Sequence, residues 1–271
     1  MNGRALSLGD SLDGTVNNPQ VATVVAMHLL ALGAFFFPPS VSTLGAACLL
    51  HFLTGCFGIS LGYHRLITHR AFSAHPIFLY VCAFLGNLAW LGGPITWAAL
   101  HRAHHRHPDE LGDPHARSRG FLWSHVAWIF RVKPNGFSVQ DAYRWVGDLK
   151  DDRVLRWLNR QGFALNLAVA LPVLLFSPEL FFWAFPLRVV LVWHTTWLIN
   201  SFAHGPSETG EMRIWNRAWL AVVSYGEGMH RNHHRSPRSP HFSRRAWKDP
   251  GFVALGICHR LGWVRWNRGR Y

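Results

Sequence analysis

Four long runs without acidic or basic side chains constrain this chain more than any other feature. They cover residues 21–37, 41–63, 163–176 and 180–201, and the only charged residue within them is Arg188. A bilayer core of about 30 Å takes about 20 apolar helical residues, so each run is long enough, or nearly long enough, to cross it. Four buried helices of a soluble protein are the alternative, but 14 Trp and 19 Phe beside only 15% charged residues favour a membrane protein.

Two proline-containing breaks pair these runs into hairpins. Pro38-Pro39-Ser40 separates the first two runs, and Ser177-Pro178 separates the last two. Proline ends helices and favours turns. We therefore predict an all-α integral membrane protein with a single domain over residues 1–271. Its four transmembrane helices form two hairpins, at about 21–37, 41–63, 161–177 and 180–201.

The basic residues orient the hairpins. No Lys or Arg lies within residues 5–64 or 161–187, whereas residues 65–160 and the segment after 213 are rich in both. By the positive-inside rule, both turns face outward and both basic regions face the cytoplasm. We expect a multi-pass protein of a bacterial inner membrane or its equivalent. Residues 64–160 and 202–271 would form a helical cap at the cytoplasmic face.

Histidine carries the chemical information in this sequence. The clusters are His64 and His69 in HRLITH, His101, His104 and His105 in HRAHH, and His230, His233 and His234 in HRNHH, and His204 ends the phrase NSFAH. Spacings of three and four place side chains on one helix face, so the second and third clusters can each present a compact group. The five-residue step between the first two histidines turns about 140° on an ideal helix. Those two therefore reach different metals, or the helix is loosened there.

The number of clustered histidines indicates two metal ions. Transition metals take about four to six ligands, so nine histidines exceed what one ion can use. Imidazole suits Fe, Zn, Cu and Ni alike, so the ligands alone do not choose the metal. The remaining histidines are scattered, and we expect them to be hydrogen-bonded packing residues: His28, His51, His75, His107, His115, His125, His194, His241 and His259. The first two lie inside predicted spans, where a polar group needs a partner or a purpose.

One further apolar segment tests whether the clusters can meet. If residues 75–94 crossed the membrane, the first and second clusters would face opposite sides of it. The segment is interrupted by Gly86, Asn87 and the run Gly92-Gly93-Pro94. We therefore predict that it lies in the membrane plane or re-enters it, and we expect the same of residues 215–225. All the clusters would then lie at the cytoplasmic membrane surface.

These motifs resemble those of the membrane fatty-acid desaturases, and most closely the stearoyl-CoA and cyanobacterial-type acyl-lipid Δ9 desaturases. The similar phrases are GYHRLITHRAF, WAALHRAHHRHPDELGDPH, RGFLWSH, NSFAHG and GEGMHRNHH, within about residues 58–234. The resemblance implies a di-iron centre whose ligands are the nine clustered histidines, with Asn200 holding a water on one iron. It implies no catalytic residue beyond the metal site. It also implies O₂ as co-substrate and a cis double bond, at Δ9, as the product in a saturated acyl chain.

The resemblance also bears on partners. The HPGG phrase of a fused cytochrome b5 domain is absent, because His75-Pro76 is followed by Ile77. Electrons would therefore come from a separate protein, a ferredoxin or a cytochrome b5. The acyl carrier is a membrane lipid, CoA or ACP. The phrase GGPITW, residues 92–97, is more similar to the bacterial and acyl-lipid branch than to the animal enzymes.

Three further residues receive predicted roles. Glu227 lies three residues before His230, about one turn if that segment is helical, and a carboxylate commonly supports a metal-bound histidine. Cys48 and Phe52 share one face of the helix that ends at His64, about 24 and 18 Å from it at about 1.5 Å per residue. We expect these two to close the acyl tunnel. By resemblance, side-chain size at Cys48 sets the accepted chain length.

Two alternatives differ in chemistry or in class. The same metal site could hydroxylate an alkyl chain or a sterol, and product analysis separates that reaction from desaturation. A membrane metal transporter would place its ligands along a polar path near the midplane, but here only His28 and His51 lie deep. The net charge of +13 is explained by anionic lipid and an acidic protein partner, so we expect no nucleic acid.

Overall fold

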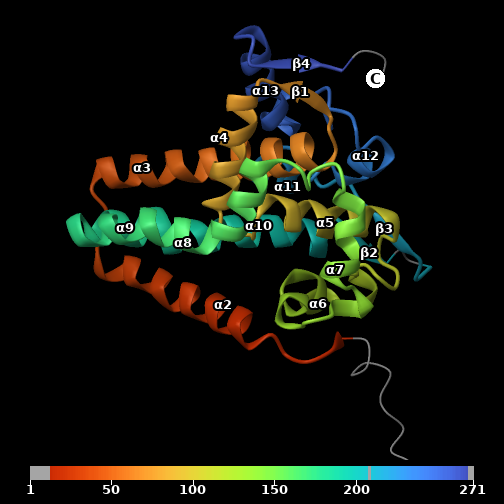
Figure 1. Cartoon of the computed structure of the whole chain (residues 1–271), viewed down its shortest axis with the longest axis horizontal. Helices are drawn as coiled ribbons and strands as arrows, with labels where there is room; N and C mark the ends of the chain where they lie inside the picture. The colour runs from red at the N-terminus through yellow and green to blue at the C-terminus, as the bar shows by residue number, and fades with distance from the viewer. Residues whose placement is uncertain (1–12, 207–208, 268–271) are drawn as a thin grey trace, which may run out of the picture.

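Four apolar helices, each long enough to cross a bilayer, form the body of the computed structural model, which describes residues 13–206 and 209–267 (Figure 1). They are Asn18–Phe36, Val41–Thr68, Arg153–Phe176 and Pro178–Phe202. The four predicted spans are confirmed. The third begins earlier than expected because Asp152 caps it, accepting hydrogen bonds from the backbone N–H groups of Val154 and Leu155.

Three of these four long helices change geometry along their length. The first consists of α2 (Asn18–Ala31) and the 3₁₀ helix η1 (Leu32–Phe36), and the second of α3 (Val41–Phe52) and the π-helix η2 (Leu53–Thr68). The third is α8 (Arg153–Phe176) throughout. The fourth consists of α9 (Pro178–Phe182), the π-helix η7 (Trp183–Leu187) and α10 (Arg188–Phe202).

The two hairpin turns lie against each other. Ser40 caps α3, and its backbone N–H donates to the carboxylate of Glu179, which lies at the turn of the second hairpin. The indole N–H of Trp183 donates to the carbonyl of Phe37 at 2.8 Å. Both turns therefore lie at the same end of the bundle, as expected of two hairpins that share one orientation.

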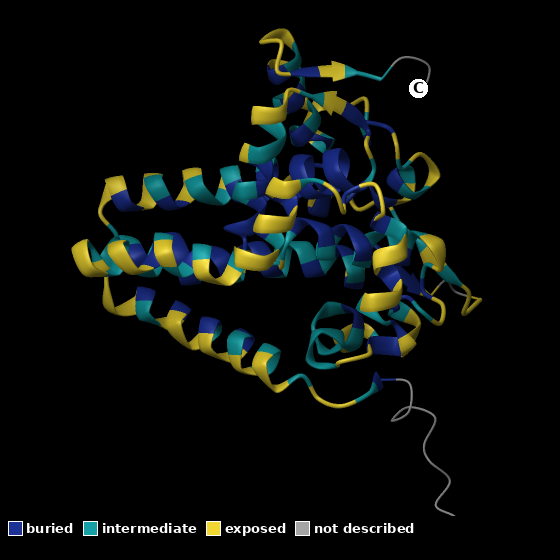
Figure 2. Ribbon diagram, viewed as in Figure 1, coloured by how far each residue is buried: buried dark blue, intermediate teal, exposed yellow. Residues whose placement is uncertain are grey.

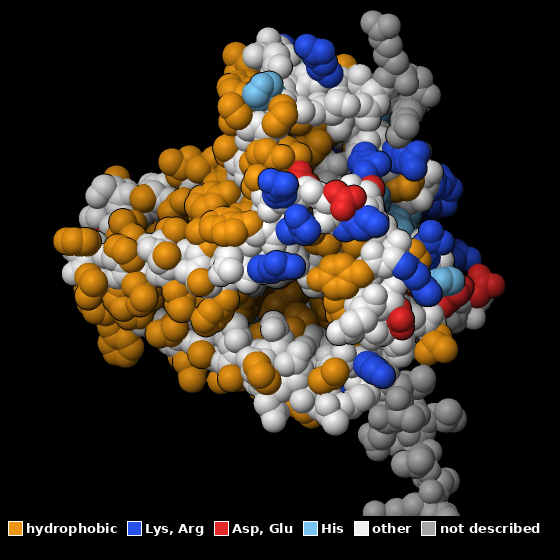
Figure 3. Space-filling model, in the orientation of Figure 1, with side chains coloured by type: hydrophobic (Ala, Val, Ile, Leu, Met, Phe, Trp, Pro, Cys, Tyr) orange, Lys and Arg blue, Asp and Glu red, His pale blue; other side chains and the backbone are white. Residues whose placement is uncertain are grey.

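The outer surface of the bundle is apolar. Figure 2 shows exposed residues along the outer faces of α2, α3 and α8, and Figure 3 shows that the side chains over this part of the molecule are hydrophobic. Phe35, Val41 and Phe176 are 83%, 91% and 89% exposed. Lys and Arg gather at the opposite end in Figure 3. Only lipid makes such an apolar surface stable, so the fold is that of an integral membrane protein.

The cap is built from short elements around the ends of the long helices. Two small antiparallel sheets pair β1 (Phe72–Ala74) with β4 (Val264–Trp266) and β2 (His204–Pro206) with β3 (Met212–Ile214). The helices of the cap are α4 (Pro76–Asn87), α5 (Pro94–Arg106), η3 (Arg117–Arg119), α6 (Phe121–His125), η4 (Ala127–Phe130), η5 (Pro134–Gly136), α7 (Val139–Ala142), η6 (Tyr143–Val146), α11 (Ala218–Val223), α12 (His230–Arg235), η8 (Ala246–Lys248) and α13 (Pro250–Arg260).

The two apolar segments predicted not to cross the membrane are short helices in the structure. Helix α4 has 12 residues and stands nearly perpendicular to the long helices in Figure 1. Helix α11 has only 6 residues. The chain therefore enters and leaves the cap on one side, and the histidine clusters on either side of α4 can meet.

The π-helix η2 determines where its two histidines point. The backbone N–H of His69 donates to the carbonyl of His64 at 3.1 Å, a hydrogen bond between residues five apart. A π-helix has more residues per turn than an α-helix, so a five-residue step returns to nearly the same face. Of the two alternatives raised by this spacing, the loosened helix is the one observed.

A buried ion pair fastens η2 to the cap. Arg65 and Asp249 are both 0% exposed, and Nη2 of the arginine lies 2.8 Å from Oδ1 of the aspartate. The same guanidinium donates to the carbonyls of Pro240 and Tyr225 at 2.8 and 3.1 Å. The aspartate also caps α13. One buried charge pair therefore joins a long helix, α13 and the loop that precedes α12.

Replacing Asp249 with Ala should destabilise the protein by about 3 kcal/mol, because it breaks a buried ion pair and leaves Arg65 with only the carboxylate of Glu227, 3.5 Å from its Nε. Thermal unfolding of the purified protein in detergent measures this loss. Glu211→Ala is the control, since its pair with Arg213 spans 3.7 Å and both side chains are more than half exposed. Equal unfolding midpoints for the two variants would show that the buried pair does not hold the cap.

Candidate metal centre

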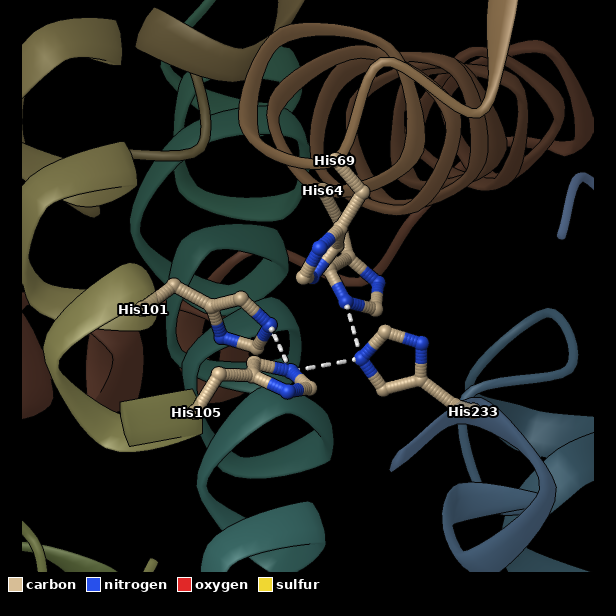
Figure 4. A group of neighbouring side chains, drawn as sticks. All are labelled: His64, His69, His101, His105 and His233. Atoms are coloured by element: carbon tan, nitrogen blue, oxygen red, sulfur yellow. Dashed lines mark hydrogen bonds between the residues drawn. The ribbon is translucent and has the colours of Figure 1, made fainter. Parts of the chain in front are cut away.

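The clustered histidines form two adjacent groups. The five-histidine group contains His64, His69, His101, His105 and His233, and the four-histidine group contains His104, His204, His230 and His234. Within each group, one nitrogen from every residue lies within 4.8 Å of the others. Figure 4 shows the first group, whose imidazoles point toward one another from η2, α5 and α12. Sequence clustering selected these residues, and folding brings all of them together.

Helix α5 serves both groups because its histidines face two directions. The Nε2 atoms of His101 and His105, one turn apart, are 3.0 Å from each other. His104 turns the other way, and its Nε2 lies 3.2 Å from Nε2 of His234.

Helix α12 also presents its histidines to both groups. His233 reaches the five-histidine group, 3.0 Å from His64, while His230 and His234 form the second group with Nε2 atoms 3.1 Å apart. The rings of His105 and His234, one from each group, stack with centroids 4.2 Å apart. The two groups therefore adjoin at these two rings.

Buried carboxylates fix the orientation of three of the histidines. The Nδ1 atoms of His64, His104 and His204 lie 2.6, 2.8 and 2.7 Å from oxygens of Glu227, Asp113 and Asp109, respectively. Because Nδ1 carries the proton donated to the carboxylate, the other ring nitrogen is left with its lone pair directed into the group. This arrangement is the usual support of metal-binding histidines.

Burial favours the neutral form of seven of the nine grouped histidines. Burial lowers the pKa of six of them well below its ordinary value, and repulsion from neighbouring rings lowers it further. These six are His69, His101, His104, His230, His233 and His234. The same two causes lower the pKa of His105 to about 3. Neutral imidazole is the form that binds a metal.

The residues present fit metal ions in both groups. The Nε2 atoms of His69 and His204 are buried and have no hydrogen-bond partner. Asp109 and Asp113 are buried, and among the described residues no Lys or Arg pairs with either. Lone pairs that converge beside uncompensated negative charge favour bound cations.

Of the three supporting carboxylates, only Glu227 is predicted from the sequence, and it supports a different histidine from the one predicted. Residues 224–228 form a turn rather than a helix, and Glu227 reaches His64 instead of His230. Burial alone would raise the pKa of Glu227, but the neighbouring imidazole, Arg65 and the hydroxyl of Ser60 lower it below its ordinary value. The carboxylate is therefore ionised.

Asp109 and Asp113 were missed. Their signal was present in the phrase HPDELGDPH, where three acids, Asp109, Glu110 and Asp113, follow shortly after a histidine cluster. His115, predicted to be a packing residue, is buried against the second of these acids, and its backbone N–H donates to Oδ1 at 3.1 Å. It helps to hold the carboxylate that supports His104.

Three of the scattered histidines form a row of close ring contacts outside the two histidine groups. Nε2 of His28 lies 3.1 Å from Nε2 of His194, whose Nδ1 lies 3.0 Å from Nε2 of His125. Nδ1 of His125 lies 3.0 Å from the hydroxyl oxygen of Ser201. The deep histidine on α2 therefore has a partner, whereas His51 Nδ1 is buried without one.

Two cavities meet at the histidines. The outer cavity, about 530 Å³, lies between α2, α5, α8 and α10, and the inner cavity lies between η2, α10 and residues 224–230. Both are lined by Trp97, His101, Thr196 and Asn200. The inner cavity measures about 60 Å³, and it adjoins the outer cavity at these four side chains, beside the two histidine groups. In Figure 3 the surface is hollowed beside α8, next to several Lys and Arg side chains.

The residues predicted to close the acyl tunnel lie outside both cavities. Cys48 is exposed on α3, and Phe52 meets the inner cavity only through Tyr225, with ring centroids 5.8 Å apart. Helix α3 turns this face toward the bundle surface. The positions of these two residues therefore do not support the predicted role. Asn200 borders both cavities and lies four residues before His204, a member of the four-histidine group.

Fold and site together define an integral membrane protein with a histidine-rich centre suited to metal binding and open to an apolar cavity. The family described as fatty acid desaturase matches residues 21–251. The chain belongs to this family and is a fatty-acyl desaturase, an oxidoreductase that introduces a double bond into an acyl chain.

Several relatives cover most of the chain. It is 38% identical over 262 residues to the sn-2 palmitoyl-lipid 9-desaturase of Nostoc sp., covering 91% of this chain and 90% of the relative. It is 37% identical over 260 residues to the sn-1 stearoyl-lipid 9-desaturase of Anabaena variabilis, covering 92% and 94%. The acyl-CoA 5-desaturase AL21 of Anemone leveillei is 32% identical over 251 residues, covering 89% and 76%.

Glu227→Gln should impair desaturation without abolishing it. The amide keeps the shape of the side chain but loses the charge that orients His64, and loss of such a support costs about 10–100-fold in metal affinity or activity. Metal content and turnover of the purified variant measure the effect. Glu110→Gln is the matched control, because that side chain is exposed and lies 3.8 Å from the exposed His107. Wild-type values for both variants would show that Glu227 gives no support.

Proposed function

We propose that this desaturase holds two iron ions, one in each histidine group, and uses O₂ to introduce a cis double bond at Δ9 of a saturated acyl chain. The observation that carries the proposal is the pair of histidine groups side by side at the junction of two cavities. Bound iron would activate O₂, the oxidant, to break an unactivated C–H bond, which no side chain can do. The nine histidines would be its ligands, with Asn200 acting through a water.

The chain's own residues position the substrate and exclude water. Trp97 stacks on His101 with ring centroids 4.9 Å apart and lines both cavities, as does Thr196. These two side chains border the path where an acyl chain would pass the five-histidine group. Holding one pair of methylenes beside the metals supplies the orientation that a reaction without a polar handle requires.

We propose a membrane lipid as the acyl carrier, ahead of CoA and ACP. The cyanobacterial relatives, at 37–38% identity, are named for lipid-bound acyl chains, and the plant relative named for acyl-CoA is 32% identical. A separate ferredoxin or cytochrome b5 would supply the electrons. We place the site at the cytoplasmic face by the positive-inside rule, and we treat residues 1–271 as one desaturase domain.

Expression in cells supplied with saturated fatty acids tests the proposal, with the double bond located by mass spectrometry. The expected product is a cis-9 monoene, and a hydroxylated chain would favour the hydroxylase alternative. His104→Ala and His233→Ala should abolish product while the protein stays in the membrane. His125→Ala and His241→Ala should retain substantial turnover, since neither ring belongs to a histidine group. The same turnover from all four variants would contradict the ligand assignment.

A further inference from the structure

The inner cavity ends at a defined wall. Its lining residues farthest along their helices from the histidines are Gly55 on η2 and Val192 on α10, and Tyr225 completes the end from the cap. Gly55 precedes His64 by nine positions, no more than about 13 Å at about 1.5 Å per residue. An acyl chain that passes the metals into this cavity therefore has a limited depth to fill.

Tyr225 forms the part of this wall that comes from the cap. A Cβ built on Gly55 would lie 2.7 Å from Cε2 of Tyr225, so the tyrosine ring rests directly on the backbone of η2. On its other side the ring packs edge-on against Phe52. Gly55 and the ring both line the inner cavity, so a methyl group at Gly55 would take up space at the end of the cavity and press the ring away from η2.

The backbone of Tyr225 is held in a conformation that tyrosine rarely adopts. Its φ is 58°, in the left-handed region that favours glycine. Its carbonyl accepts hydrogen bonds from Nη2 of Arg65 at 3.1 Å and from the backbone N–H of Gly251 at 3.2 Å. A strained residue persists only where its surroundings enforce it, and such residues gather at functional sites. Here the buried arginine that fastens η2 to the cap also fixes the direction of the ring.

A buried cation closes the bundle one turn beyond the cavity. Arg188 precedes Val192 by four positions on α10, is 3% exposed, and donates from Nη1 to the hydroxyl of Thr54, the neighbour of Gly55, at 2.8 Å. Its other bonds go to the carbonyls of Ala184 and Leu88. Among the described residues no carboxylate pairs with it, and the C-terminal end of α4 offsets its charge. The methyl end of an acyl chain has no hydrogen-bonding group, so it could not replace these bonds if it displaced them.

We propose that Tyr225 is the residue that sets the maximum acyl chain length, by meeting the methyl end of the substrate with a ring seated on Gly55. This inference rests on the proposed function, because it requires an acyl chain in the inner cavity. Neither Cys48 nor Phe52 lines the inner cavity, so neither would contact an acyl chain that ends at this ring.

The test compares full-length variants in cells supplied with saturated acids from myristate to arachidate. Tyr225→Gly removes the ring and suits the left-handed backbone, so it should fold and admit longer chains. The ratio of long to short monoenes should rise about tenfold or more, the discrimination that one methylene commonly produces in a hydrophobic pocket. Tyr225→Phe is the matched control and should keep the wild-type profile.

Gly55→Ala provides an independent test from the opposite wall. Its methyl group would press against the ring, shorten the cavity and shift the products toward shorter chains. In every variant the double bond should keep its distance from the carboxyl end, because the metals and the outer cavity are unchanged. A general packing defect would lower the yield of all products alike.

The two proposals fail in different ways. If the wild type forms no unsaturated product, the proposed function is wrong. If the wild type is active and Tyr225→Gly keeps its chain-length profile, the role of Tyr225 is wrong. Should Tyr225→Gly not accumulate, an unchanged profile in Gly55→Ala overturns the role, and a shift toward shorter chains supports it.

Discussion

Crowded imidazoles beside buried carboxylates are the interaction on which the rest of this structure depends. Nine imidazoles crowded into two adjacent groups cannot all carry a positive charge, since adjacent positive charges would repel strongly in a buried site. Neutral rings cannot balance the negative charge of Asp109 and Asp113. The charge balance is completed when cations occupy the two groups, so metal binding and stability of the cap are coupled.

The architecture around this centre follows from the need to bring ligands together at one membrane surface. The π-helix aligns His64 and His69, and α5 and α12 each present histidines in two directions. The buried pair of Arg65 and Asp249 then joins η2 to the cap and fixes the turn that carries Tyr225 and Glu227. One set of buried charges thereby positions a metal support and the end of the inner cavity at the same time.

The sequence was most informative where a single chemical property repeats. Uncharged runs predicted the four spans, and the three histidine clusters supplied eight of the nine members of the two groups. It was least informative where partners are distant along the chain. Glu227 and His64 are separated by 163 positions, 227 minus 64, and no local pattern pairs them. The loosened helix was only one of two alternatives, because ideal α geometry cannot describe η2. The tunnel prediction failed for Cys48 because helical spacing gives a shared face but not the direction in which that face points.

Anomalous diffraction at the iron absorption edge, from crystals of fully active enzyme, would locate the metals themselves. We expect two iron peaks per chain, one within the five-histidine group and one within the four-histidine group. Zinc, which imidazole also binds well, would give an inactive protein with the same two positions. A single iron peak in fully active enzyme, or peaks outside these groups, would contradict the two-metal account.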